Sequence, residues 1–161
     1  TVFRQHGMRV ITCLNGRSQR TRALAEKAGL EDMPTLGDVM QTADLILSIL
    51  PPEYAVQQAQ EAAAAMQATN AYPDYVDCNA ISPTTTKKVA SAFDDMPVNV
   101  IYGGLIGLNP LKESEGTRLY ISGKATALAR QLDGRGLVVR DLGDEISRAS
   151  AMKMVYASST R

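Results

Sequence analysis

The sequence predicts an α/β protein built on a doubly wound, mostly parallel sheet. Two observations lead to this prediction. Short apolar runs, too short to be helices, alternate with longer amphipathic or alanine-rich stretches along most of the 161 residues. Strands and helices that alternate in this way form a parallel sheet with helices on both faces. The composition, 45% hydrophobic and 21% charged, is that of a globular domain with a substantial core.

Six segments are predicted to be strands because each is a short apolar run bounded by turn residues. They are residues 9–14, 44–50, 75–78, 98–102, 118–122 and 137–140. The run 44–50 is the most continuous of these, which predicts a central parallel strand. After the fourth strand, a glycine-rich turn is expected over 103–107, where the backbone could approach a ligand closely.

Helices are predicted between these strands, from amphipathic spacing and from capping residues. They are residues 20–28, 36–42, 53–67, 82–93, 124–132 and 145–160, preceded by the tail of a helix over 1–7. The last helix is apolar nearly all round, so it is predicted to be buried or to lie between domains. We therefore divide the chain into a sheet domain, 1–142, and the start of a helical domain, 143–161.

Composition also argues against several classes of function. The formal net charge is zero, whereas proteins that bind nucleic acids carry a basic excess. No apolar run approaches the roughly 20 residues that span a membrane. A single histidine and no clustered carboxylates provide no metal site. No signal peptide is visible, which predicts a cytoplasmic protein without membrane or nucleic-acid partners.

The turn after the first predicted strand reads Asn15-Gly16-Arg17-Ser18, with Arg22 on the helix that follows. In doubly wound nucleotide-binding sheets, an acid at this place holds the ribose 2′-hydroxyl of NAD. Here positive charge, hydroxyls and free backbone N–H groups suit the 2′-phosphate of NADP instead. A solvated helix start with scattered arginines is an equal alternative from the turn alone.

Lys153 lies on the same face of the last helix as Ile146 and Ala149. Spacing alone favours a lysine that extends its ammonium to solvent. A lysine buried beside a ligand would instead have a lowered pKa and would be a proton donor.

Four motifs occur in order along nearly the whole chain, namely 16–18, 47–52, 77–83 and 143–154. Together they resemble the 6-phosphogluconate dehydrogenase and β-hydroxyacid dehydrogenase superfamily of NAD(P)-dependent oxidoreductases. The nearest likeness is to its poorly characterised 6-phosphogluconate dehydrogenase-like branch. The resemblance implies a Rossmann-like cofactor domain and a homodimeric full-length protein. It also implies hydride transfer between a nicotinamide cofactor and a small carbonyl/hydroxy or imine/amine substrate. The turn chemistry makes NADP the expected cofactor and NAD the less favoured one.

The resemblance and the turn chemistry together assign site residues. Lys153 is expected to be the general acid/base. The cofactor-binding residues are expected to be Asn15, Gly16, Arg17, Ser18, Arg22, Leu50, Pro51, Pro52 and Asn79. The substrate-binding residues are expected to be Ser82, Gly104, Ile106 and Gly107.

Three departures from the superfamily pattern qualify this interpretation. Its first strand and Gly-x-Gly-x-x-Gly turn are expected before Thr1 and are absent here. Residues 1–161 alone are therefore expected to bind NADP weakly or not at all. Strands 9–14 and 44–50 are likewise expected to share no continuous ladder with the later ones. Ile106 replaces a serine and Ala157 an asparagine, which leaves open a non-catalytic ligand-sensing or scaffold module.

Overall fold

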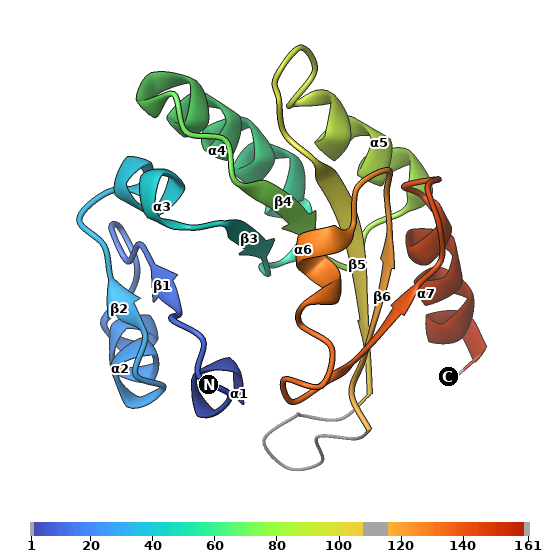
Figure 1. Ribbon diagram of the computed structural model, residues 1–161, viewed down its shortest axis with the longest axis horizontal. Coiled ribbons are helices and arrows are strands. Elements are labelled where there is room, and N and C mark those ends of the chain that lie inside the picture. Colours follow the sequence, from blue (N-terminus) through green and yellow to red (C-terminus); the bar gives the residue numbers. More distant parts are fainter. Residues whose placement is uncertain (1, 108–115, 160–161) are drawn as a thin grey trace.

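A computed structural model describes residues 2–107 and 116–159 of the chain. Strands and helices alternate along it, as the sequence predicts (Figure 1). The strands are β1 Ile11–Thr12, β2 Glu31–Asp32, β3 Leu45–Ser48, β4 Asp74–Asp77, β5 Val100–Ile106, β6 Arg118–Ser122 and β7 Val138–Asp141. The helices are α1 Val2–Gln5, α2 Gln19–Lys27, α3 Leu36–Thr42, α4 Ala55–Thr69, α5 Pro83–Ser91, α6 Ala127–Arg130 and α7 Arg148–Ser159, with a 3-10 turn, η1, at Pro52–Tyr54.

The main sheet has five strands in the order β3-β4-β5-β6-β7. All neighbouring pairs are parallel except β5 and β6, which are antiparallel. This confirms the predicted α/β class with a mostly parallel sheet. Strands β1 and β2 form a separate parallel pair beside it (Figure 1).

The separation of the two sheets agrees with one part of the sequence-based expectation and corrects another. Strand β1, from the predicted run 9–14, pairs only with β2 within the described part of the chain. Strand β3, from the run 44–50, does join the later strands, with Leu45 opposite Asp74. The expectation that β3 would be left outside the ladder was therefore wrong, because one edge of β3 pairs with β4 and that pairing needs no further strand. Strand β2 was not predicted, since its two residues are polar and exposed and carry no apolar signal.

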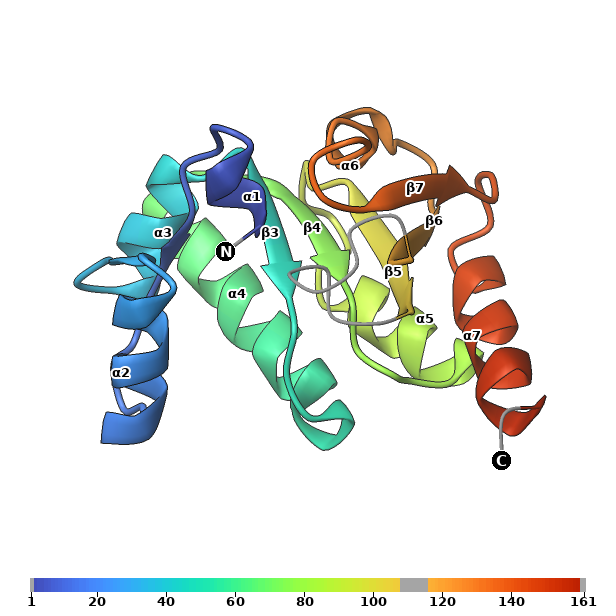
Figure 2. The same cartoon turned by 90° about the horizontal axis from the view of Figure 1, so that it is seen from below.

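Helices cover both faces of the main sheet (Figure 2). On one face, α3, α4, α5 and α7 pack over a core whose largest members are Met40, Met66, Tyr75, Phe93 and Tyr102. On the other face, α1 and α6 contact a second core that includes Val76, Ile101, Leu119, Ile121 and Leu132. Four alanines of helix α4 are fully or almost fully buried. Because their side chains are small, α4 lies close to the sheet, and their burial costs little side-chain entropy on folding.

The glycine-rich turn expected over 103–107 is largely strand, which corrects the prediction. Residues 103–106 belong to β5 and pair with β6. A Cβ on Gly103 would lie 2.9 Å from Cγ1 of Val76 and 3.0 Å from Sγ of Cys78. The glycine therefore serves tight packing inside the sheet rather than a change of direction. Among the glycines of residues 103–107, only Gly107, at φ +124°, has a backbone conformation that residues with a side chain rarely adopt.

The last helix is shorter and less buried than its composition indicates. It begins at Arg148 rather than at 145, and the carboxylate of Glu145 accepts the backbone N–H and hydroxyl of Ser147 just before it. Ala149 and Ser150 near its start are buried, but Val155 is 68% and Tyr156 49% exposed. The prediction that this helix is buried on all sides is therefore wrong within the described residues, and the alternative, a helix that lies between domains, stays a prediction.

Candidate cofactor and reaction site

The turn after β1 is anchored at its ends and open in its middle. The hydroxyl of Ser18 caps α2 by accepting the N–H of Thr21 at 3.3 Å. The amide Nδ2 of Asn15 donates to the carbonyl oxygen of Pro34 at 2.5 Å. Between them, Gly16 has φ +71°, and a Cβ there would meet no atom within 4 Å. The backbone of this turn is thus accessible to a ligand.

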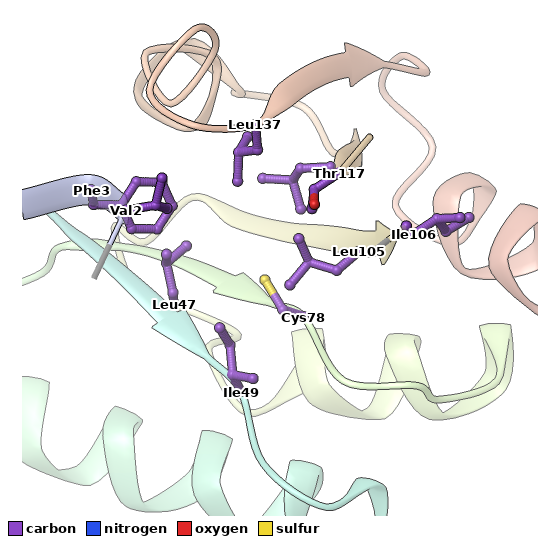
Figure 3. Close-up of a pocket in the computed structure, with 11 residues that line it drawn as sticks. Val2, Phe3, Leu47, Ile49, Cys78, Leu105, Ile106, Thr117 and Leu137 are labelled. Carbon is purple, nitrogen blue, oxygen red and sulfur yellow. The ribbon is translucent and has the colours of Figure 1, made fainter. Parts of the chain in front are cut away.

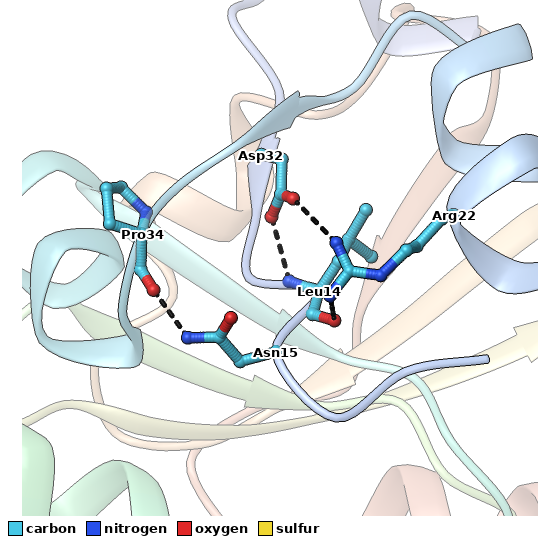
Figure 4. Close-up of polar contacts among 5 residues, drawn as sticks. All are labelled: Leu14, Asn15, Arg22, Asp32 and Pro34. Carbon is cyan, nitrogen blue, oxygen red and sulfur yellow. Dashed lines mark hydrogen bonds and ion pairs between the residues drawn. The ribbon is translucent and has the colours of Figure 1, made fainter. Parts of the chain in front are cut away.

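Arg22 and Arg17, both predicted to meet a phosphate, have different surroundings. The guanidinium of Arg22 donates to the carbonyl oxygen of Leu14 at 2.6 Å and forms an ion pair with Asp32 at 3.4 Å (Figure 4). Arg17 is exposed, and its side chain makes no hydrogen bond or ion pair with any described residue. Sequence reasoning missed Asp32 because it lies on β2, which has no apolar pattern.

Asn79, at the end of β4, is buried and bonded internally. It is 2% exposed. Its Oδ1 accepts the backbone N–H of Leu50 at 2.7 Å, and its Nδ2 donates to Ser48 at 3.3 Å and to Asp77 at 3.2 Å. These bonds hold the end of β3 against the end of β4. Asn79 therefore positions the turn that begins at Leu50, and its amide has little capacity left for a ligand.

The turn that Asn79 holds is exposed. Pro51 and Pro52 follow Leu50, and Pro52 opens η1 and leads into α4. Because this turn lies at the carboxyl end of a parallel strand, it is on the edge where open α/β sheets bind ligands. The cofactor contact expected at this turn stays a prediction.

Lys153 reaches from α7 to the same edge of the sheet. Its Nζ donates to the carbonyl oxygen of Cys78 at 3.3 Å. Its stem lies against β5, where a Cβ on Gly104 would be 3.6 Å from the Lys153 Cβ. Lys153 is half-buried and its amine turns toward β4, so it does not extend freely to solvent as its spacing alone favours. Burial of this lysine beside a ligand stays a prediction.

The electrostatics of this lysine are set by burial and by one carboxylate. Burial lowers the pKa of Lys153, and the neighbouring Cys78 and Asp77 oppose that shift. Burial raises the pKa of Asp77, which hydrogen bonds from Asn79 and the charge of Lys153 oppose. Asp77 is 1% exposed. Sequence reasoning used Asp77 only as part of a motif and gave it no role of its own.

Several hydroxyls fix α7 and the end of β4 to one another. Ser122 on β6 donates to the carbonyl of Ile146 at 2.7 Å and accepts the N–H of Ala149 at 3.1 Å. Ser150 donates to the carbonyl of Ile81 at 2.6 Å. Tyr102 donates to the carbonyl of Asn79, also at 2.6 Å. Lys153 is thus carried by a helix with a firmly determined position.

The residues expected to bind substrate do not all lie together. Gly104 and Ile106 alternate onto the α7 face of β5, the face of Lys153. Ser82 caps α5 by accepting the N–H of Thr85 at 3.2 Å. Gly107 ends β5.

An apolar cavity of about 320 Å³ lies on the opposite face of the sheet. Cys78 and Leu105 reach toward it, and Ile106 lies at its edge (Figure 3). This cavity does not include Lys153 among its lining residues.

Metal-ligating groups and membrane-spanning helices can be sought only among the described residues. No group of three or more His, Cys, Asp or Glu side chains is placed to hold a metal ion in residues 2–107 and 116–159. No helix in the same ranges is long and apolar enough to cross a bilayer.

No family model matches the sequence. Among solved structures, the chain is similar to a conserved protein of unknown function with structural similarity to 3-hydroxyacid dehydrogenases. The TM-score is 0.85 at 28% identity, over 99% of this chain and 58% of that one. The fold is that of the hydroxyacid dehydrogenase superfamily. This confirms the resemblance that the motifs predict, at the level of the superfamily and not of one branch.

More distant structures have the same fold. An imine reductase variant from Myxococcus stipitatus, in complex with NAD+, gives a TM-score of 0.76 at 17% identity, over 99% of this chain and 54% of that one. A reductive aminase from Aspergillus terreus, in complex with NADPH and ethyl levulinate, gives 0.70 at 16%, over 88% and 50%.

A curated relative is an uncharacterized 28.5 kDa protein of Methanothermus fervidus, 25% identical over 99% of this chain and 59% of its own length. The chain thus spans less than two thirds of the relatives that it matches. The neighbours in complex with NAD+ or NADPH are 17% and 16% identical to this chain, so they show its fold alone.

Proposed function

We propose that this chain forms most of the cofactor domain of an NADP-dependent oxidoreductase. The reaction is hydride transfer between the nicotinamide and a small carbonyl/hydroxy or imine/amine substrate. The observation that carries the proposal is Lys153, whose half-buried amine lies 3.3 Å from the Cys78 carbonyl at the carboxyl edge of the parallel strands. Ligands of open α/β sheets bind at this edge.

The two turns at this edge fit the two ends of a dinucleotide. The turn 15–18 offers open backbone at Gly16 and the unpaired guanidinium of Arg17 for the adenosine ribose and its 2′-phosphate. The exposed turn at Leu50-Pro51-Pro52, which Asn79 holds, lies along the cofactor in this proposal. The 161 residues contain no Gly-x-Gly-x-x-Gly turn for the pyrophosphate. In the superfamily that this chain resembles, that turn follows another strand, which would lie in space between β1 and β3.

Lys153 supplies the proton in this proposal. As an ammonium it donates to the substrate oxygen or nitrogen while hydride reaches the adjacent carbon, and in the reverse direction the neutral amine accepts that proton. Bound NADPH supplies the hydride. Burial favours the neutral amine, so the lysine can exchange a proton closer to neutral pH than a solvated lysine can.

The substrate face beside this lysine is apolar where the superfamily has a serine. Ile106 shares the α7 face of β5 with Gly104. An apolar side chain there provides no hydrogen bond to a substrate carboxylate. We therefore infer a neutral aldehyde, ketone or imine rather than a hydroxy acid.

A panel of aldehydes, keto acids and imines, assayed for NADPH oxidation by the protein from its complete reading frame, tests this function. We expect turnover with neutral carbonyl or imine substrates. Cofactor binding without turnover on any member of a broad panel would favour the non-catalytic sensing or scaffold module, which Ile106 and Ala157 leave open. Homodimerisation stays a prediction from the superfamily resemblance, and a cytoplasmic location stays a prediction from the sequence.

A further inference from the structure

We propose that Arg22 and Asp32 together set the preference for NADP over NAD at the turn 15–18, and that Arg22 does so as a positioning residue. In this role Arg22 holds the carboxylate of Asp32 against Leu14 and does not contact the phosphate itself. The inference rests on the proposed function. It concerns three residues, Leu14, Arg22 and Asp32, which we call the Leu14 clamp.

The clamp fixes both backbone polar groups of the residue that precedes the turn. The ladder between β1 and β2 ends with the N–H of Met33, which donates to the carbonyl of Thr12 at 2.7 Å. Beyond it, the N–H of Leu14 donates to Oδ1 of Asp32 at 2.9 Å, and the carbonyl of Leu14 accepts from Arg22 at 2.6 Å (Figure 4). Side chains thus replace the ladder and determine where the turn begins.

The same contacts occupy a carboxylate that lies close to this turn. A carboxylate beside the ribose favours the 2′-hydroxyl of NAD and repels a 2′-phosphate. Here Oδ1 of Asp32 accepts from Leu14 and Oδ2 lies 3.4 Å from Nη1 of Arg22. Asp32 is therefore directed at the backbone with its charge compensated. Arg17, which is exposed, is then a cation available to the phosphate.

This role differs from the direct phosphate contact that the sequence suggests for Arg22, and the two roles make opposite predictions. If Arg22 acts through Asp32, removing the arginine exposes an uncompensated carboxylate, and removing the carboxylate as well cancels the effect. If Arg22 contacts the phosphate, removing the carboxylate restores nothing. The carbonyl of Leu14 keeps a partner in either case, because the N–H of Arg17 also donates to it at 3.0 Å.

The chain offers a matched control pair. Arg9 and Glu31 form an ion pair of 2.6 Å across the same two strands, with side-chain exposures of 61% and 50% against 45% and 43% for Arg22 and Asp32. Arg9 precedes β1, so this pair lies at the end of the strands away from the turn. Removing this pair takes away one positive and one negative charge, as removing Arg22 and Asp32 together does, but it leaves the Leu14 clamp unchanged.

The test measures dissociation constants for NADPH and NADH by fluorescence titration, on protein from the complete reading frame. The variants are Arg22→Gln, Asp32→Asn, their double variant, and the control Arg9→Gln/Glu31→Gln. Thermal unfolding of each variant establishes that it is folded.

We expect Arg22→Gln to weaken NADPH binding by about tenfold and NADH binding by no more than about threefold. The double variant should return NADPH binding to within about threefold of wild type, and Asp32→Asn alone should not weaken it. The control should bind both nucleotides as wild type does.

A double variant as weak toward NADPH as Arg22→Gln overturns the inference, because Arg22 is then a direct ligand. Equal weakening of both nucleotides by Arg22→Gln also overturns it, since the clamp then serves the turn without selecting between cofactors. Wild-type protein that binds neither nucleotide overturns the proposed function and this inference with it. The first two outcomes leave the proposed function standing.

Discussion

The amine of Lys153 lies 3.3 Å from the carbonyl oxygen of Cys78, which joins the last described helix to the end of β4. A second link, from Ser150 to the carbonyl of Ile81, lies one turn earlier on the same helix. The loop after β4 is also tied to β3 through Asn79 and Leu50. The proposed proton donor and the proposed cofactor turn are therefore parts of one hydrogen-bonded unit, and changes within it should alter both.

Asn79→Ala should destabilise the fold more than an ordinary exposed asparagine does. The variant leaves the N–H of Leu50 and Oδ2 of Asp77 without the buried amide of Asn79, which costs about 1–3 kcal/mol. Urea unfolding measures the change. Asn99→Ala is the control, because Asn99 bonds Asp74 at an exposed position. An equal loss of unfolding free energy in the two variants would show that the buried hydrogen bonds of Asn79 contribute no more to stability than an exposed one does.

Gly107→Ala should destabilise the protein more than Gly134→Ala, although both glycines have positive φ. A Cβ on Gly107 would collide with the carbonyl oxygen of Gly116, whereas a Cβ on Gly134 would meet nothing within 4 Å. Backbone strain alone costs about 1–2 kcal/mol at either site, and the collision adds to it only at Gly107. Denaturant unfolding of the two variants should separate them, and equal midpoints would contradict the packing at the end of β5.

Some features of this molecule could be predicted from local sequence, and others depend on contacts between distant segments. The runs 44–50 and 118–122 gave strands close to their predicted positions, because continuous apolar residues suit a buried strand. Gly103 and Gly104 looked like a turn, since local sequence does not show that β4, β6 and α7 approach them. The role of Asp32 was invisible for the same reason, because its partners Leu14 and Arg22 lie on the preceding strand and helix. The lysine was found by resemblance, and its buried partner Asp77 only by structure.

Residues 1–161 alone should bind NADPH weakly or not at all. They contain no Gly-x-Gly-x-x-Gly turn, and β1 pairs only with β2 among the described strands, so the adenosine turn is not joined by a ladder to the main sheet. Equilibrium titration of this segment, compared with protein from the complete reading frame, measures the difference. Micromolar binding by the segment would show that the two turns suffice for the cofactor.

The pH dependence of reduction should report the charge of Asp77. Burial lowers the pKa of Lys153, and the Asp77 carboxylate opposes the shift, so Asp77→Asn should lower that pKa further. Because the ammonium donates the proton, activity falls as pH rises through the pKa of Lys153. In the variant this fall should move to lower pH.

The other groups near this pair stay neutral over the working range. Burial raises the pKa of Cys78 to about 12 and also raises the pKa of Tyr75 and Tyr102. The profile of kcat/KM against pH is the measurement, with Asp74→Asn, at the half-buried start of β4, as the control. A uniform loss of activity at every pH, with no shift of the profile, would mean that Asp77 serves only the fold.

The most direct measurement is turnover by Lys153→Ala in the protein from its complete reading frame, using a substrate that the wild type reduces. We expect kcat to fall by about 10²–10⁴-fold, with the NADPH dissociation constant within about threefold of wild type. The exposed Lys88→Ala should keep full activity. Wild-type turnover by Lys153→Ala would contradict the assignment of this lysine as the proton donor.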